Sequence, residues 1–142
     1  MNAVRRVTSD YVIEIHGRII RDTGGTGGIR DRGRIESAVE LMWSGSGDIE
    51  FYPSLPEKAA MLGFVLAHDH GFVDGNKRTA FQAMEYFLGV NDLKLVASLD
   101  DGILAMESVA TGHMSKREFT DWVMDHVDLL TEEERLKYDH IV

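Results

Sequence analysis

Ten consecutive residues, from His70 to Thr79, bring together the groups that a phosphate-transfer reaction requires. The run reads HGFVDGNKRT. A histidine exchanges a proton near neutral pH, and a carboxylate such as that of Asp74 binds a hard divalent cation. Asn76, Lys77 and Arg78 stand where a helix is expected to begin, and free backbone N–H groups at a helix N-terminus favour an anion. The run therefore predicts a base, a metal ligand and a phosphate cradle within one loop.

The same run resembles the signature of the Fic/Doc family, His-x-Phe-x-[Asp/Glu]-[Gly/Ala]-Asn-[Gly/Lys]-Arg, and fills each of its fixed positions. Family members that transfer AMP usually have Gly after the Asn and a second Arg three residues beyond the first. This chain has Lys77 and Phe81 at those positions, which resembles the Doc (death-on-curing) branch. The segments 23–40 and 53–70 are also Doc-like, so the resemblance covers most of the chain, roughly from Ser9 to Val127.

The resemblance implies a Doc-like toxin, a kinase that transfers the γ-phosphate of ATP to a Ser or Thr hydroxyl with Mg²⁺ as cofactor. It implies elongation factor Tu as the target, arrest of translation as the outcome, and a small antitoxin as a partner. Each site residue then has an expected role: His70 is the general base, Phe72 anchors the loop, Asp74 binds Mg²⁺, and Gly75, Asn76, Lys77 and Arg78 hold phosphate. Gly71 and Gly75 are expected to adopt backbone conformations closed to other residues, and Gly75 to keep side-chain bulk away from the phosphates.

Lys77 is the residue that discriminates between the activities, because its side chain fills space that Gly leaves open in AMP-transferring relatives. The resemblance implies that ATP then binds in the reversed direction, with its γ-phosphate towards the target. A Fic-type AMP transferase is the alternative function. A catalytically inactive binding module is a third possibility, disfavoured because His70 and Asp74 are intact.

Several motif residues also have an ordinary structural interpretation. Asp74 or Asn76 would serve as the N-cap of the following helix, and Arg78 as a surface arginine. His68 is expected to be structural, because residues i and i+2 of a helix point about 200° apart and so His68 and His70 form a poor metal pair.

Length, composition and charge limit the expected domain organisation, partners and location of the protein. The 142 residues, 44% apolar and 27% charged, predict one domain over 1–142, with a core at about 9–127 and a tail at 128–142 that is helical or frayed. The net charge of −9 argues against nucleic-acid binding, and the absence of cysteine excludes disulfides and thiol chemistry. No apolar run approaches the length of a membrane span or signal peptide, so we expect no membrane partner and a cytoplasmic location.

Helical periodicity dominates the chain and predicts an all-α bundle of about six helices, with the catalytic loop between two central ones. The expected helices are 9–23, 32–43, 56–70, 77–88, 98–110 and 115–127, with an extended segment at 92–96. Their inward positions are Val12, Ile15, Ile19, Ile35, Val39, Met42, Leu62, Val65, Leu66, Ala80, Met84 and Phe87, joined by Phe81 or Leu88. Ser115 with Glu118, and Thr131 with Glu134, form capping-box signals.

Two further segments were considered for nucleotide binding and its control. The Gly-rich run Thr23–Gly28 lacks the Gly-Lys-Ser/Thr of a P-loop, so we interpret it as a flexible connection flanking the substrate groove. The nearest match to the inhibitory motif of Fic proteins, Ser46 to Glu50, fails at its last position, Phe51. Inhibition is therefore expected to come from a separate partner.

Overall fold

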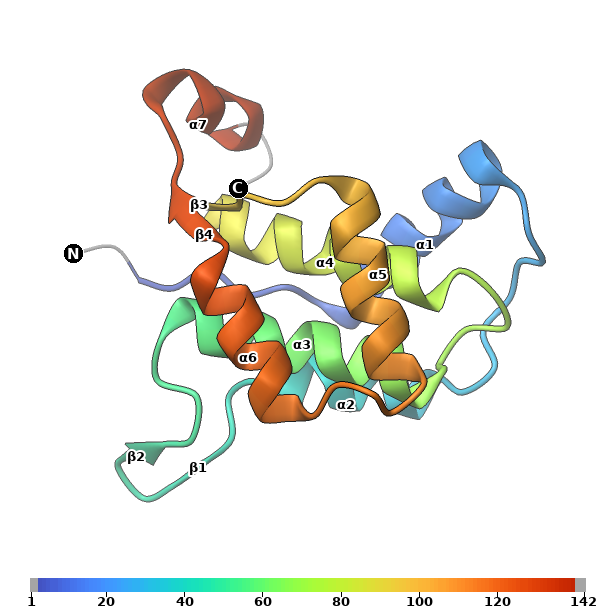
Figure 1. Ribbon diagram of the computed structural model, residues 1–142, viewed down its shortest axis with the longest axis horizontal. Coiled ribbons are helices and arrows are strands. Elements are labelled where there is room, and N and C mark those ends of the chain that lie inside the picture. The colour runs from blue at the N-terminus through green and yellow to red at the C-terminus, as the bar shows by residue number, and fades with distance from the viewer. Residues whose placement is uncertain (1–2, 140–142) are drawn as a thin grey trace.

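The computed structural model describes residues 3–139, and these form a bundle of seven helices with two small antiparallel strand pairs (Figure 1). The helices are α1 (Ser9–Thr23), α2 (Arg32–Leu41), α3 (Leu55–Asp69), α4 (Asn76–Val90), α5 (Leu99–Ala110), α6 (Lys116–Asp125) and α7 (Glu132–Asp139). The strands are β1 (Gly45–Ser46), β2 (Ile49–Glu50), β3 (Leu93–Leu95) and β4 (Val127–Leu129). The all-α prediction is confirmed.

Helix α3 is the centre of the bundle, with α2, α4, α5 and α6 packed around it, and α1 lies against α4. Every inward position predicted from periodicity is buried, including both Phe81 and Leu88. Val7, which precedes the expected core, is buried as well. Helices α3 and α4 approach closely at Gly63, where a side chain would clash with Met84. The two helices that carry the motif are thus held together tightly.

Side-chain caps fix where most of the helices begin. The side chain of Thr8 accepts from the N–H of Tyr11, and that of Ser98 from Asp101. Reciprocal capping boxes join Ser54 to Glu57 before α3, Ser115 to Glu118 before α6, and Thr131 to Glu134 before α7. Capping of this kind supplies acceptors for backbone donors that the first turn of a helix leaves free.

Several helix boundaries differ by one or two residues from those predicted from the sequence. Gly89 does not end α4, which runs on to Val90, because Gly89 is a packing position where the ring of Tyr138 from α7 leaves no room for a side chain. Helix α6 ends at Asp125, and Val127 instead begins β4, which pairs with β3. The described part of the tail forms a seventh helix, α7, which is one of the two outcomes expected for the tail, and Thr131 and Glu134 cap it as predicted.

The strand pairs and α7 lie away from the loop that joins α3 to α4 (Figure 1). The β1–β2 hairpin is tied to the start of α3 by Lys58, whose buried ammonium group lies 2.8 Å from Oε1 of Glu50 and also donates to the Tyr52 carbonyl. Among the helices of the described chain, none combines the length and the apolar character needed to cross a membrane.

Candidate functional site

The C-terminal end of α3 presents His70 to solvent. His70 is the C-cap, with φ 51° and ψ 56°, a left-handed conformation that is uncommon for residues other than glycine. Its imidazole is exposed and has no hydrogen-bond partner within residues 3–139. The preceding carbonyl, that of Asp69, accepts a hydrogen bond of 2.6 Å from Arg34 of α2. Position 70 is therefore held by its backbone while its side chain stays free to act as a base.

Backbone pairing with the α1–α2 connection holds the loop after His70. The carbonyl of Gly71 accepts from the N–H groups of Arg30 and Asp31, at 2.8 and 2.9 Å, and Val73 donates to Gly28 at 3.1 Å. Ile29 and Phe72 form an antiparallel bridge between these bonds. The end of the Gly-rich segment is thus paired with the motif loop, a more specific role than the flexible connection predicted.

Phe72 and Asn76 lock the two ends of the loop together. Phe72 is 2% exposed, and its predicted inward position is observed. The Asn76 carboxamide accepts from the Phe72 N–H and donates to the Phe72 carbonyl, both at 3.0 Å. Asn76 is the first residue of α4 and does not serve as its N-cap, a position taken by Gly75. The second amide proton of Asn76 is left for a ligand, because Nδ2 carries two.

His16 of α1 supports the motif loop through two contacts, a role that no local sequence pattern indicates. Its imidazole is 4% exposed and stacks on the Phe72 ring, and its Nε2 lies 2.7 Å from the carbonyl oxygen of Asp74. By contrast, His68 stacks on Phe64 and lies 2.9 Å from Oδ1 of Asp69, so it takes no part in the site.

One of the two loop glycines differs from its predicted role. Gly75 has the expected left-handed backbone, with a φ of +79°, and a Cβ there would also lie 3.3 Å from Ile20 of α1. Gly71 is outside the left-handed region, and a Cβ there would lie 2.7 Å from Ile35. Close packing, not unusual backbone conformation, therefore requires glycine at Gly71.

The Asp74 carboxylate is exposed and is oriented by two backbone donors. Oδ1 accepts from the Gly75 N–H at 2.9 Å, and Oδ2 accepts from the Thr26 N–H at 3.2 Å. Asp74 is therefore not the N-cap of α4, because it binds Gly75, which precedes the helix. Residues 3–139 contain no cluster of three His, Cys, Asp or Glu side chains suited to a metal ion. One oriented carboxylate does fit a Mg²⁺ ion whose other ligands are phosphate oxygens and water.

The start of α4 offers donors to an anion. No side chain caps this helix, and its first backbone hydrogen bond is donated by Thr79 to the carbonyl of Gly75. The preceding N–H groups of α4 therefore have no backbone acceptor among the described residues. Arg78 is exposed and forms no ion pair in the same range, whereas Lys77 contacts Glu107 of α5. This arrangement suits a phosphate group, which would find backbone donors and two cations together.

One pocket, of about 350 Å³, collects these groups. Six of the seven predicted site residues line it, the exception being the buried Phe72: His70, Asp74, Gly75, Asn76, Lys77 and Arg78. Ile103 and Ala110 of α5 form its apolar wall. A base at the rim, an oriented carboxylate and a cationic helix N-terminus fit the phosphate groups of a nucleotide.

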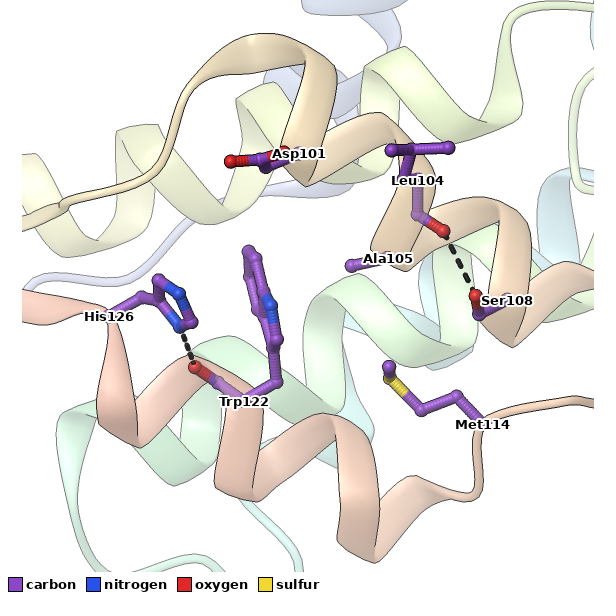
Figure 2. A pocket seen from close by; sticks show the side chains of 7 residues that line it. All are labelled: Asp101, Leu104, Ala105, Ser108, Met114, Trp122 and His126. Atoms are coloured by element: carbon purple, nitrogen blue, oxygen red, sulfur yellow. Dashed lines mark hydrogen bonds between the residues drawn. The ribbon is translucent and has the colours of Figure 1, made fainter.

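A second pocket of about 280 Å³ lies between α5 and α6 (Figure 2). Trp122 stands in it beside His126, whose Nδ1 lies 2.6 Å from the Trp122 carbonyl oxygen. Asp101 is its charged residue from α5, and it contains no Lys or Arg. Such a lining does not favour a phosphate group. The pocket at the motif is therefore the candidate site for a nucleotide. Helix α5 forms a wall of both.

Five residues from outside the motif contribute to the site although no sequence pattern assigned them to it: His16, Arg34, Ile103, Glu107 and Ala110. Only the three residues of α5 share a pattern that can be seen in the sequence. Ile103, Glu107 and Ala110 are spaced i, i+4 and i+7, so they share one face of α5, but nothing in that spacing names the motif as the neighbour.

Comparison with known proteins identifies the family to which the chain is related. The Fic/DOC family profile matches residues 6–88, which include the whole motif. The chain is also similar to a protein described as Toxin Doc from Mycolicibacterium smegmatis (strain ATCC 700084 / mc(2)155), with 42% identity over 77 residues. That match covers 54% of this chain and 59% of the length of the relative.

Proposed function

The chain belongs to the Fic/DOC family, and from this premise we propose that it is a Doc-like toxin that phosphorylates a protein target. The observation that carries the proposal is the convergence of His70, Asp74 and the cationic start of α4 on one pocket. The similarity to a protein described as Toxin Doc supports the Doc branch. The target proposed is a Ser or Thr hydroxyl of elongation factor Tu, so that phosphorylation arrests translation in the cytoplasm.

In the proposed reaction, His70 takes the proton from the target hydroxyl while the hydroxyl oxygen forms a bond to the γ-phosphorus of ATP. The bond from that phosphorus to the bridging oxygen breaks, and ADP leaves with the electron pair. Lys77, Arg78 and the N–H groups of α4 hold the phosphate oxygens. Asp74 would hold Mg²⁺, which when bound offsets the negative charge of the phosphates.

The choice of γ-phosphate transfer over AMP transfer rests on two residues of α4. Lys77 projects beside the pocket, where AMP-transferring relatives have glycine. Phe81 replaces a second arginine, and it is 2% exposed, packed so closely against Gly102 of α5 that a side chain there would clash. The helix therefore offers no cation one turn beyond Arg78, and a nucleotide bound in the AMP-transferring direction would lack that partner.

Labelled ATP tests the proposal directly. The protein is incubated with purified elongation factor Tu, and separately with a cell extract, using ATP labelled at either the α or the γ phosphate. We expect label from the γ position alone on a protein band, and a phosphate adduct on Ser or Thr by mass spectrometry. The His70→Ala protein is the matched control and should give no band. An AMP adduct would replace the kinase proposal with the nucleotidyl-transferase alternative, and no transfer by either route would favour a binding module.

The proposal also includes a small antitoxin partner. Within residues 3–139, Ser46–Glu50 lies in the β1–β2 hairpin and lines no part of the 350 Å³ pocket. Expression of this chain alone should stop growth, and co-expression of a small protein encoded beside it should restore growth. Harmless expression of the active protein would contradict the toxin proposal while leaving the chemistry intact.

A further inference from the structure

An ion pair joins the motif to a helix outside it. The Lys77 ammonium nitrogen lies 2.5 Å from Oε2 of Glu107, and the two side chains are 42% and 51% exposed. Glu107 lies on the same face of α5 as Ile103 and Ala110, which form the wall of the site pocket. A carboxylate therefore stands beside the space in which the proposed function places phosphate.

The two cations of the motif are in different states. Lys77 is paired with Glu107, whereas Arg78 has no carboxylate within ion-pair distance in the described part of the chain. A phosphate group and the Glu107 carboxylate are both anions. Both would bind the Lys77 ammonium group, and the two would repel one another. Binding of polyphosphate is therefore opposed by Glu107 twice, through the pair that must be shared or broken and through like charge.

We propose that Glu107 is an intramolecular competitor for Lys77 that holds this side chain beside the pocket and sets the affinity of the site for polyphosphate. Glu107 is a positioning residue, since it acts through Lys77. The inference rests on the proposed function for the location of the phosphates, but it does not depend on which phosphoryl group is transferred. Because the pair is half exposed, its expected effect on affinity is about two- to fivefold.

Calorimetric titration with inorganic triphosphate at low salt tests the inference without any transfer reaction. Four proteins are compared with the unmodified chain: Glu107→Gln, Lys77→Met, the double variant, and Asp101→Asn. Asp101 is the matched control, because it is an acid of the same helix that faces the pocket between α5 and α6 (Figure 2). Circular dichroism confirms that each variant retains its helix content.

We expect Glu107→Gln to bind triphosphate about two- to fivefold more tightly, with the gain shrinking as salt is raised. Asp101→Asn should leave the affinity unchanged. Lys77→Met should weaken binding, and Glu107→Gln should add nothing in that background, since the competitor has lost its cation.

Several results would overturn the inference. These are unchanged or weaker binding by Glu107→Gln, an equal gain in Asp101→Asn, or a gain that persists in the Lys77→Met background. Transfer of γ-label by the unmodified chain alongside any of them would leave the proposed function standing. Absence of triphosphate binding by every protein would overturn the inference as well.

Discussion

The imidazole of His16 lies flat against the ring of Phe72, with ring centroids 3.8 Å apart and planes 8° apart. The same imidazole reaches the Asp74 carbonyl oxygen through Nε2 at 2.7 Å. One side chain from α1 therefore supports both the anchor of the motif loop and the residue proposed to bind Mg²⁺.

Replacing His16 with Phe should separate these two contacts, because Phe keeps the aromatic surface and removes the hydrogen bond. Loss of the bond to this partly buried carbonyl should lower the free energy of unfolding by about 1 kcal/mol and raise the Mg²⁺ concentration that transfer requires. Urea unfolding and a Mg²⁺ titration of the rate measure both effects. Wild-type values in both measurements would show that the Asp74 carbonyl does not depend on His16.

Replacing His70 with Gly or with Ala should give two equally inactive proteins of different stability. Loss of the base should lower the transfer rate about 10²–10⁴-fold in each. Position 70 has a φ of 51°, which glycine adopts without a steric cost, so His70→Gly should be about 1 kcal/mol more stable than His70→Ala. Thermal unfolding compares them. Equal stabilities would contradict the left-handed conformation of position 70.

Gly25→Ala should disturb Asp74, and Gly24→Ala is its matched control. Both glycines have positive φ, at +107° and +82°, so both substitutions strain the backbone. A Cβ at Gly25 would lie 2.7 Å from Oδ2 of Asp74, whereas one at Gly24 would meet no atom within 4 Å. We expect similar losses of stability, about 1 kcal/mol, but a raised Mg²⁺ requirement only in Gly25→Ala. An equal Mg²⁺ requirement in the two variants would remove Gly25 from the site.

Phe81→Arg should unfold the protein and fail to create an AMP transferase. Phe81 is buried between α4 and α5 against Gly102, so a guanidinium there would be an unpaired charge in the core. The expected cost is about 3–5 kcal/mol, which approaches the whole stability of a small domain. Chemical unfolding and product mass spectrometry test this. A folded variant that makes AMP adducts would show that position 81 faces the nucleotide.

Acid should loosen α7 before it unfolds the bundle. Hydrogen bonding to Lys94 lowers the pKa of Glu134 from 4.5 to about 2. A lowered pKa means that the carboxylate contributes stability above pH 4.5 and loses that contribution as the pH falls from 4.5 towards 2. The protection factors of the α7 amides against hydrogen exchange should therefore fall in this window, and those of Glu134→Gln should be low throughout it. Protection factors that stay constant across this window in the unmodified chain would contradict the assignment.

The sequence predicted most of the fold because helix periodicity and capping are local signals. Ser98, Ser115 and Thr131 start helices as their side chains predicted. The β3–β4 pairing was not predicted, because two three-residue strands more than thirty residues apart carry no local pattern of their pairing. The end of α4 was predicted wrongly at Gly89 for a related reason, since the neighbour of this glycine, Tyr138, is remote in the chain.

The motif residues were identified in the same way, from a contiguous run. The residues that contact the motif from elsewhere in the chain were not identified, because His16, Arg34 and Glu107 lie on three different helices. His16 is an ordinary inward position of α1 by periodicity, and only the tertiary structure shows that its ring faces Phe72. The catalytic roles themselves remain predictions.

The pairing of the Gly-rich segment with the motif loop also has a consequence for how the protein is made. The bonds from His16 and Thr26 to Asp74 span 58 and 48 residues, and closing such long loops costs entropy before any contact repays it. The pocket also needs its wall of Ile103 and Ala110 from α5, so it cannot be complete until the chain beyond residue 110 has been made. A growing chain that ends before α5 would carry the complete HGFVDGNKRT run and yet no complete pocket. A protein proposed to arrest translation would therefore gain its pocket only after most of its own translation is finished.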